Sequence, residues 1–93
     1  MIYEWDEAKN KQNIEKHGIS FESAREVFKD PNHLILTNQA HSQAEDRFYC
    51  IGKIDDKVIT VRFVFRDSAI RIIGAGHWRK ERKIYERKNK NQT

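Results

Sequence analysis

One stretch of the chain, from Val58 to Arg66, alternates between large apolar residues and residues of other kinds. The apolar set consists of Ile59, Val61, Phe63 and Phe65. The residues between them are Val58, Thr60, Arg62, Val64 and Arg66. Alternation with a period of two, in β-branched and aromatic residues, predicts a β-strand with one buried face. Such a strand holds its arginines on the opposite face, which is therefore the first place to expect function.

Helical patterns lie before and after this strand. Asp6 is an expected N-cap of a helix that runs to His17, and Gly18 follows as an expected C-terminal stop. Ser20 caps a second expected helix that ends at Asp30-Pro31. Its buried side is predicted to consist of Phe21, Ala24, Val27 and Phe28. A last helix is predicted over residues 78–87, with residues 88–93 as a frayed tail.

Further strands are predicted over residues 2–5, 33–37, 47–54 and 70–76. Asp55-Asp56 is an expected hairpin turn, although it lacks the glycine that is usual there. This element order predicts one α+β domain over residues 1–93, in which helices cover one face of a mainly antiparallel sheet of three to five strands. The arginines are expected on the other face.

Charge is unevenly distributed along the chain. Residues 1–46 carry 5 Lys+Arg against 9 Asp+Glu, whereas residues 47–93 carry 13 against 5. A basic second half favours a surface that binds a polyanion. The single cysteine, Cys50, excludes a disulfide within the chain and is expected to be a buried small apolar residue, which fits a reducing compartment. The sequence shows neither a secretory signal nor an apolar run long enough for a membrane span, so we expect a cytoplasmic protein.

The sequence favours neither a metal site nor a cofactor site. The four histidines match no common spacing of metal ligands: His17, His33, His41 and His77. Gly74-Ala75-Gly76 lacks the further residues of a phosphate-binding loop, and its expected role is close packing of the backbone before the last helix.

Arginine is the residue type that points to a function. Arg47, Arg62, Arg66 and Arg71 fall on adjacent predicted strands. Guanidinium groups suit phosphate because two parallel donors match two phosphate oxygens. Other basic groups are expected to border the same surface: Lys16, His17, Arg79, Arg82 and Lys83. Together with rings that stack on unpaired bases (Tyr49, Trp78 and Tyr85), they favour single-stranded RNA as a ligand. The alternative for each arginine is a surface ion pair with Glu45, Asp67 or Glu81.

An ordered set of residues over nearly the whole chain resembles the BrnT family of bacterial toxins. The first part of the set is Trp5-Asp6, Lys9, Asn13, Lys16-His17-Gly18-Ile19, Phe21, Ala24, Val27-Phe28 and Asp30-Pro31. The second part is Glu45, Arg47, Ile51-Gly52, Arg66, Arg71-Ile72-Ile73, Glu81-Arg82 and Tyr85. The resemblance implies a RelE-like fold and a ribonuclease activity that halts translation. It also implies a BrnA-like antitoxin with a ribbon-helix-helix domain, which forms a heterotetramer with the toxin and binds operator DNA.

The resemblance and the arginine pattern together give expected roles. Metal-independent RNA cleavage needs groups that bind the scissile phosphate and move protons. Arg66 and Arg71 are the expected phosphate ligands, and either His17 or His77 is the expected acid–base group. Glu45 and Glu81 are possible orienting groups or bases. The expected RNA-binding side chains are Lys16, Arg47, Arg62, Arg79, Arg82 and Tyr85.

One departure from the family keeps a second hypothesis open. Many members have a serine and an arginine near the end of the last strand, where this chain has Gly74-Ala75-Gly76-His77. The alternative is therefore a catalytically weak or inactive relative that binds RNA or the antitoxin. In either case an acidic or helical antitoxin segment is expected to cover the arginine face.

Overall fold

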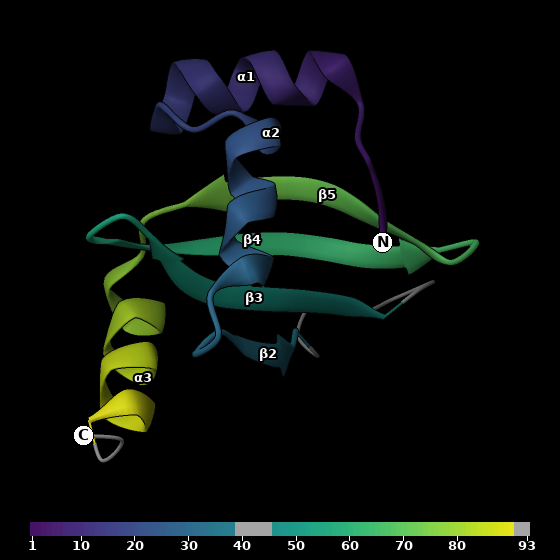
Figure 1. The fold of residues 1–93 in the computed structure, drawn as a ribbon. Coiled ribbons are helices and arrows are strands. Elements are labelled where there is room, and N and C mark those ends of the chain that lie inside the picture. Colours follow the sequence, from purple (N-terminus) through teal and green to yellow (C-terminus); the bar gives the residue numbers. More distant parts are fainter. Residues whose placement is uncertain (39–45, 91–93) are drawn as a thin grey trace.

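A five-stranded sheet organises the protein in the computed structural model, which describes residues 1–38 and 46–90. The elements in chain order are β1 (Ile2–Glu4), α1 (Glu7–His17), α2 (Phe21–Ala24), the 3-10 helix η1 (Arg25–Lys29), β2 (Leu34–Thr37), β3 (Arg47–Ile54), β4 (Lys57–Arg66), β5 (Ala69–Gly76) and α3 (Arg79–Asn89) (Figure 1). The strands are ordered β1-β5-β4-β3-β2. Among the strands of the described residues, β1 and β5 pair in parallel and the other neighbours pair antiparallel. The predicted α+β fold with a mainly antiparallel sheet is confirmed.

The expected helix boundaries at the start of the chain are confirmed by their capping contacts. The Asp6 carboxylate accepts a hydrogen bond from Ala8 N at 2.8 Å, and Gly18 ends α1 with a φ of 70°. The Ser20 hydroxyl accepts a hydrogen bond from Ser23 N at 3.0 Å and so caps α2. The second predicted helix is α-helical for only four residues and then tightens into η1.

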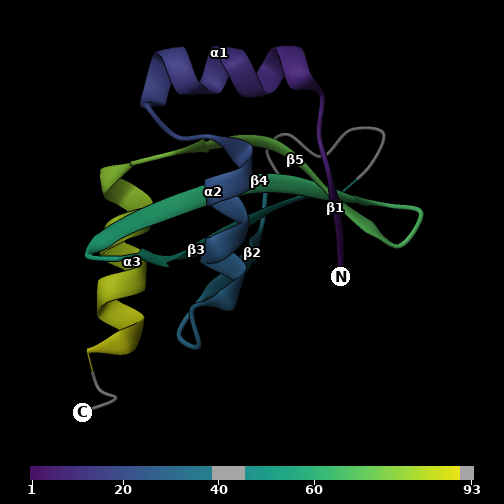
Figure 2. The same ribbon diagram turned by 45° about the horizontal axis from the view of Figure 1, so that its top comes forward.

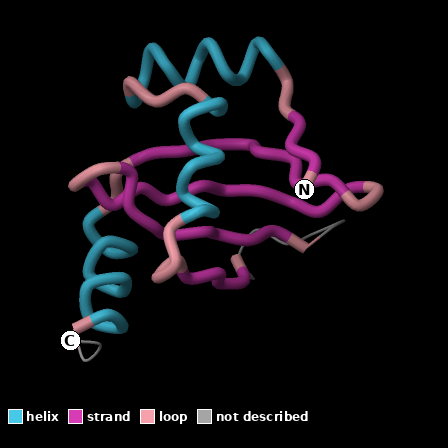
Figure 3. Tube along the Cα trace, in the orientation of Figure 1, coloured by secondary structure: helices cyan, strands magenta, loops and turns pink. Residues whose placement is uncertain are grey.

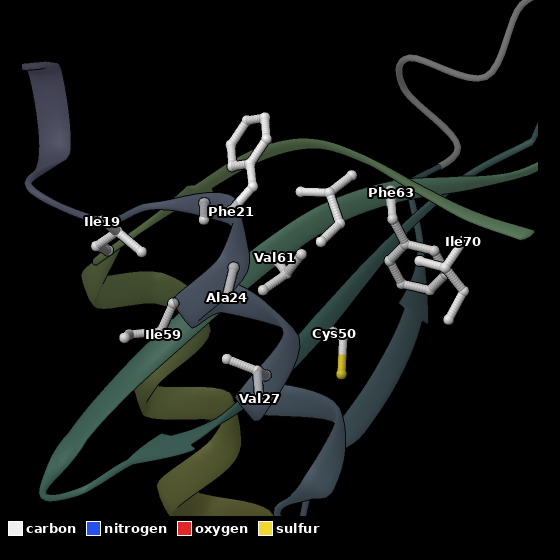
Figure 4. Packing of buried hydrophobic residues seen from close by; sticks show 11 residues of the cluster. Ile19, Phe21, Ala24, Val27, Cys50, Ile59, Val61, Phe63 and Ile70 are labelled. Carbon is white, nitrogen blue, oxygen red and sulfur yellow. The ribbon is translucent and has the colours of Figure 1, made fainter. Parts of the chain in front are cut away.

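The main core lies between the sheet and the unit formed by α2 and η1, which crosses the middle of the strands (Figures 1 and 2). Phe21, Ala24 and Val27 are fully buried, as predicted. From β4, Ile59, Val61 and Phe63 pack against them, together with Cys50 from β3 (Figure 4). Burial raises the pKa of the Cys50 thiol to about 12, so this cysteine is a core residue.

Phe65 does not follow the prediction for its strand. Its side chain is 51% exposed, although it belongs to the same alternating set as Phe63. The reason is its position one residue before the end of β4, beyond the middle of the sheet that α2 and η1 cover (Figure 1). Its ring makes T-shaped contacts with the rings of Phe48 and Phe63.

The last helix lies on the opposite face, so the expectation of helices on a single face is wrong. Ile51 and Val58 are buried with Tyr85 of α3 in a second, smaller cluster that also contacts Leu36. This packing explains why Val58 is buried despite its place on the supposedly open face of β4. Figure 3 shows α3 descending from one end of the sheet, away from α1. The helix extends to Asn89, two residues beyond its predicted end.

Asp30 joins three separate parts of the fold. Its carboxylate accepts hydrogen bonds from Asn32 N at 2.9 Å, Lys53 N at 2.8 Å and the Tyr85 hydroxyl at 2.6 Å. Burial raises the pKa of Asp30, but these three donors outweigh burial and hold the pKa below its ordinary value. The approach is close because Gly52 has no side chain; a Cβ there would lie 2.9 Å from Val27 O.

A β-bulge between β4 and β5 decides which way the β5 side chains point. Arg62 pairs with Gly74 and Phe63 pairs with Ile72, so Ile73 is the extra residue. Side chains that pair directly across strands share a face. The extra residue shifts the alternation of β5 by one, and Arg71 and Gly74 therefore lie on the same face although they are three residues apart.

Candidate nucleic-acid interface

The strand register gathers the sheet arginines on the face opposite α2 and η1. Arg47 pairs with Val64, and Val64 pairs with Arg71 on its other side. Arg62 and Arg66 share the face of Val64, because they are two positions away from it on β4. The expectation that these four arginines meet on one face is confirmed.

The arginines line a cavity of about 460 Å³, which we call the arginine cavity. Among the described residues, the charged ones that line it are all basic: Lys9, Arg47, Arg62, Arg66 and Arg71. Val64, Ile73 and Gly74 also line it. Within the part of the chain that the structure describes, Glu4 approaches from outside, with its Oε1 3.9 Å from an Arg71 terminal nitrogen at a partly exposed position. This pair is long and solvent-screened, so Arg71 remains a group that can bind an anion.

A second cavity, of about 440 Å³, adjoins the first along α1, and we call it the α1 cavity. Lys9, Arg62, Ile73 and Gly74 line both cavities. The α1 cavity adds Lys16 and His17 from the end of the helix, and the ring of Trp78. The two predicted residues Lys16 and His17 therefore do border the arginine surface.

Among the histidines that the structure describes, His17 is the one next to this surface. Burial lowers its pKa below the ordinary value, and the nearby charges of Lys16, Arg62 and His77 lower the pKa further. The imidazole also makes a T-shaped contact with the Trp78 ring, with centroids 5.5 Å apart. His17 is therefore neutral at pH 7, which is the form that accepts a proton.

Arg62 is held by two aromatic rings. Its guanidinium carbon lies 4.2 Å from the centroid of the Trp78 ring and 5.6 Å from that of the Tyr49 ring. Cation–π contacts of this kind fix a guanidinium group without neutralising it. Among the described residues, the Arg62 Nε is buried without a hydrogen-bond partner. The sequence pointed to Tyr49 and Trp78 as platforms for bases, whereas the structure uses both rings against Arg62.

Gly76 allows the Trp78 ring to take this position. A Cβ at residue 76 would lie 2.8 Å from the Cη2 of Trp78, closer than real Cβ contacts allow. The predicted role of the glycines in close packing is therefore confirmed for Gly76. At Gly74 the nearest atom would be the Cδ of Arg62 at 3.8 Å, an ordinary contact.

The other predicted side chains that the structure describes lie outside the arginine and α1 cavities. His77, Arg79 and Arg82 line a third cavity, of about 490 Å³, beside the β3–β4 hairpin. Glu81 is buried, with 8% of its surface exposed, and lines none of the three cavities. Glu45 lies outside the described residues.

Tyr85 is engaged inside the fold. It is 4% exposed, and burial and the hydrogen bond to Asp30 raise its pKa to about 12. Stacking on a base would require this ring to leave its packing against Ile51 and Val58.

Two residues of α1 matter more than their sequence context indicates. Lys9 lines both cavities on the arginine face, and it lies seven positions before Lys16, on the same side of the helix. Asn13 lies between them and fixes α1 to the sheet: its Oδ1 accepts a hydrogen bond from Ala75 N at 3.2 Å, and its Nδ2 donates to Ile19 O at 2.8 Å. In the sequence, the seven-residue spacing of Lys9 and Lys16 indicates that both lie on one side of a helix, and this spacing could have predicted the position of Lys9.

Residues 5–81 match the sequence model of one protein family, the ribonuclease toxin BrnT of type II toxin–antitoxin systems. The chain belongs to the BrnT family. The matched range contains the arginine cavity and His17, whereas Arg82 and Tyr85 lie beyond it. No curated protein matches the chain. Membership of a type II toxin–antitoxin family implies an antitoxin partner.

Two further structural findings concern membrane-spanning helices and metal sites. Residues 1–38 and 46–90 contain no helix that is long and apolar enough to cross a membrane. The same residues contain no group of three or more His, Cys, Asp or Glu side chains placed to hold a metal ion.

Proposed function

We propose that this BrnT-family chain is a metal-independent endoribonuclease of the cytoplasm that cleaves RNA and halts translation. The observation that supports it most is the arginine cavity, where five basic side chains of the described residues line a single hollow. RNA carries its own nucleophile, the 2′-hydroxyl group. The protein therefore has to position the phosphate, stabilise the added charge on it and move protons.

Arg66 and Arg71 bind the scissile phosphate in this proposal. They lie on the paired strands β4 and β5 and line the same cavity, with Arg47 on the other side of Val64 as a supporting charge. Arginine remains protonated at every physiological pH, so the site keeps its charge while the phosphorane forms. Arg62 is a positioning residue, because the rings of Tyr49 and Trp78 fix it at the junction of two cavities.

His17 is the proposed general base. It lines the cavity that adjoins the arginine cavity, and its lowered pKa keeps it neutral. It removes the proton of the 2′-hydroxyl as the 2′-oxygen attacks phosphorus. The bond from phosphorus to the 5′-oxygen breaks, and that oxygen takes a proton from water. The products are a 2′,3′-cyclic phosphate and a 5′-hydroxyl end. His77 lines neither of these two cavities, which is why His17 is preferred to it.

The antitoxin in this proposal is a BrnA-like protein with a ribbon-helix-helix domain. It binds the toxin in a heterotetramer and supplies the contact with operator DNA. An acidic or helical segment of it covers the arginine face, since the positive lining of the arginine cavity attracts such a segment as it attracts RNA.

Expression of the chain alone in a bacterium tests the activity. We expect growth arrest, with new RNA ends that carry 5′-hydroxyl groups when the RNA is sequenced. Arg66→Ala should relieve the arrest, whereas Arg87→Ala, at an exposed position of α3 outside the three cavities, should not. Cleavage by the purified chain should persist in EDTA. A wild-type chain that is harmless and leaves RNA intact would refute the proposal.

The second candidate is an inactive relative that binds RNA or antitoxin without cleavage. It is favoured by the end of β5, where Gly76 is required by the Trp78 ring and offers no charged side chain. This candidate predicts RNA binding that weakens steeply with salt, and no cleavage products. The sequencing of RNA ends separates the two candidates.

A further inference from the structure

The third cavity lies on the same route as the two that the proposed cleavage uses. We call it the hairpin cavity; it is formed by the β3–β4 hairpin and the first turns of α3. Trp78 lines both the hairpin cavity and the α1 cavity. The α1 cavity in turn shares Lys9 and Arg62 with the arginine cavity. The three cavities are therefore neighbours in a series that starts at the arginines and ends at the hairpin.

The hairpin cavity has the charge of an anion site. Lys53 and Lys57 line it from the hairpin, and Arg79 and Arg82 line it from α3. The acidic lining residues Asp56 and Glu86 are fewer than these basic ones. All four basic side chains are exposed, and the described residues contain no ion pair that joins any of them to an acid. Their charges are therefore available to a ligand.

The strand register places the entrance of the hairpin cavity on the arginine face. Lys53 pairs with Val58, and Val58 is four positions before Arg62 on β4. The side chains of alternate strand residues share a face, so Lys53 belongs to the face that carries Arg62. A single nucleic-acid strand bound at the arginines reaches the lysines of the hairpin without passing around an edge of the sheet.

From this continuity we propose that the hairpin cavity is a second phosphate subsite, which binds the same RNA strand several nucleotides away from the scissile phosphate. This inference rests on the proposed function, because it takes RNA as the ligand. It adds a substrate class: a single strand long enough to fill the arginine, α1 and hairpin cavities. A single strand suits the route because small single-strand binding domains follow the nucleic-acid backbone with a positively charged groove, and basic side chains line each of the three cavities.

Binding of RNA in which every 2′-hydroxyl is methylated tests the inference, because such RNA lacks the nucleophile. Oligonucleotides of about 4 and about 12 nucleotides bracket the lower range of footprints of small single-strand binding domains. The double variant Lys53→Ala/Lys57→Ala removes two charges of the hairpin cavity. The matched control is Lys11→Ala/Lys29→Ala, which removes two exposed lysines that line none of the three cavities.

We expect the hairpin double variant to bind the longer oligonucleotide several-fold more weakly than the wild type. The slope of log K against log salt should fall by about 1 to 2, since each lost phosphate contact removes about 0.7 for a single strand. Binding of the shorter oligonucleotide should be unchanged, because in this proposal it binds at the arginine cavity and does not reach the hairpin lysines. The control should behave as the wild type with both lengths.

Three results would overturn the proposal. The first is a hairpin variant that binds the longer strand as tightly as the wild type does. The second is a hairpin variant that binds both lengths equally more weakly, as a general loss of charge would cause. The third is a variant that keeps its RNA affinity and loses the antitoxin, which would assign the hairpin cavity to the protein partner. A wild-type chain that binds the longer strand in this way but cleaves no unmethylated RNA would refute the proposed catalysis and support the subsite.

Discussion

Replacing Tyr85 by phenylalanine tests the role of Asp30 as the link between η1, β3 and α3. The change removes one oxygen atom and keeps the ring that packs against Ile51 and Val58. The lost contact is the 2.6 Å hydrogen bond from the Tyr85 hydroxyl to Asp30 Oδ2. Asp30 keeps its two backbone donors, Asn32 N and Lys53 N. The change therefore removes one of the three hydrogen bonds to the Asp30 carboxylate but does not leave the carboxylate without partners.

The structure sets the size of the effect. A hydrogen bond to a charged group contributes about 1.5–3 kcal/mol to stability. For a domain of this size, 2 kcal/mol corresponds to a fall of about 8–16 °C in Tm. We expect Tyr85→Phe to lose this amount near pH 7, as measured by thermal and urea unfolding followed by circular dichroism. Tyr49→Phe is the control, because the Tyr49 hydroxyl has no hydrogen bond among the described residues, and the ring contact with Arg62 remains.

The pH dependence follows from the two shifted pKa values. The pKa of Asp30 is lowered in the folded state, so its contribution is present above the unfolded pKa and disappears as the pH falls through the folded pKa. The pKa of Tyr85 is raised from 10.0 to about 12, so its contribution is present below pH 10 and disappears as the pH rises towards 12. The gap between wild type and Tyr85→Phe should therefore close at both extremes. A variant within about 0.5 kcal/mol of the wild type at pH 7, the range of ordinary surface changes, would refute this account of Asp30.

Two further predictions concern the arginine face. Gly76→Ala places a Cβ 2.8 Å from the rigid Trp78 ring and should cost about 1–3 kcal/mol in unfolding free energy, with a change in tryptophan fluorescence, whereas Gly74→Ala should cost less than 1 kcal/mol. Equal effects of the two changes would contradict the packing argument. The kcat/KM of RNA cleavage should fall on acidification with an apparent pKa below the 6.5 of an ordinary histidine, because protonation of His17 removes the base and its pKa is lowered. A pH–rate profile of His17→Asn that retains this limb would exclude His17 as the base.

Local patterns in the sequence were sufficient for the elements and their ends. Asp6, Gly18 and Ser20 determine helix boundaries through contacts within a few residues, so the sequence predicts them without knowledge of the fold. The alternation from Ile59 to Phe63 likewise predicts the buried face of β4. The arginine-bearing face of β4 follows from the same alternation.

Contacts between residues far apart in the sequence determine two features that local patterns do not predict, namely the burial of Tyr85 and the face on which Arg71 lies. Tyr85 belongs to the core because Asp30, 55 residues earlier, accepts its hydroxyl hydrogen. The bulge at Ile73 brings Arg71 to the face of Arg62, and a strand pattern read alone does not locate a bulge.

The sequence by itself determined the fold class, the basic half of the chain and the arginines that carry the proposed chemistry. Only the tertiary structure divided the basic residues among three cavities and placed Lys9 at the junction of two of them. The sequence predicted that the Trp78 ring stacks on bases, whereas in the structure this ring packs against the Arg62 guanidinium group. The physical reason is that helix caps and strand alternation depend on neighbours along the chain. The surroundings of a charged side chain depend instead on which strands pair, in which register, and on which face each helix packs.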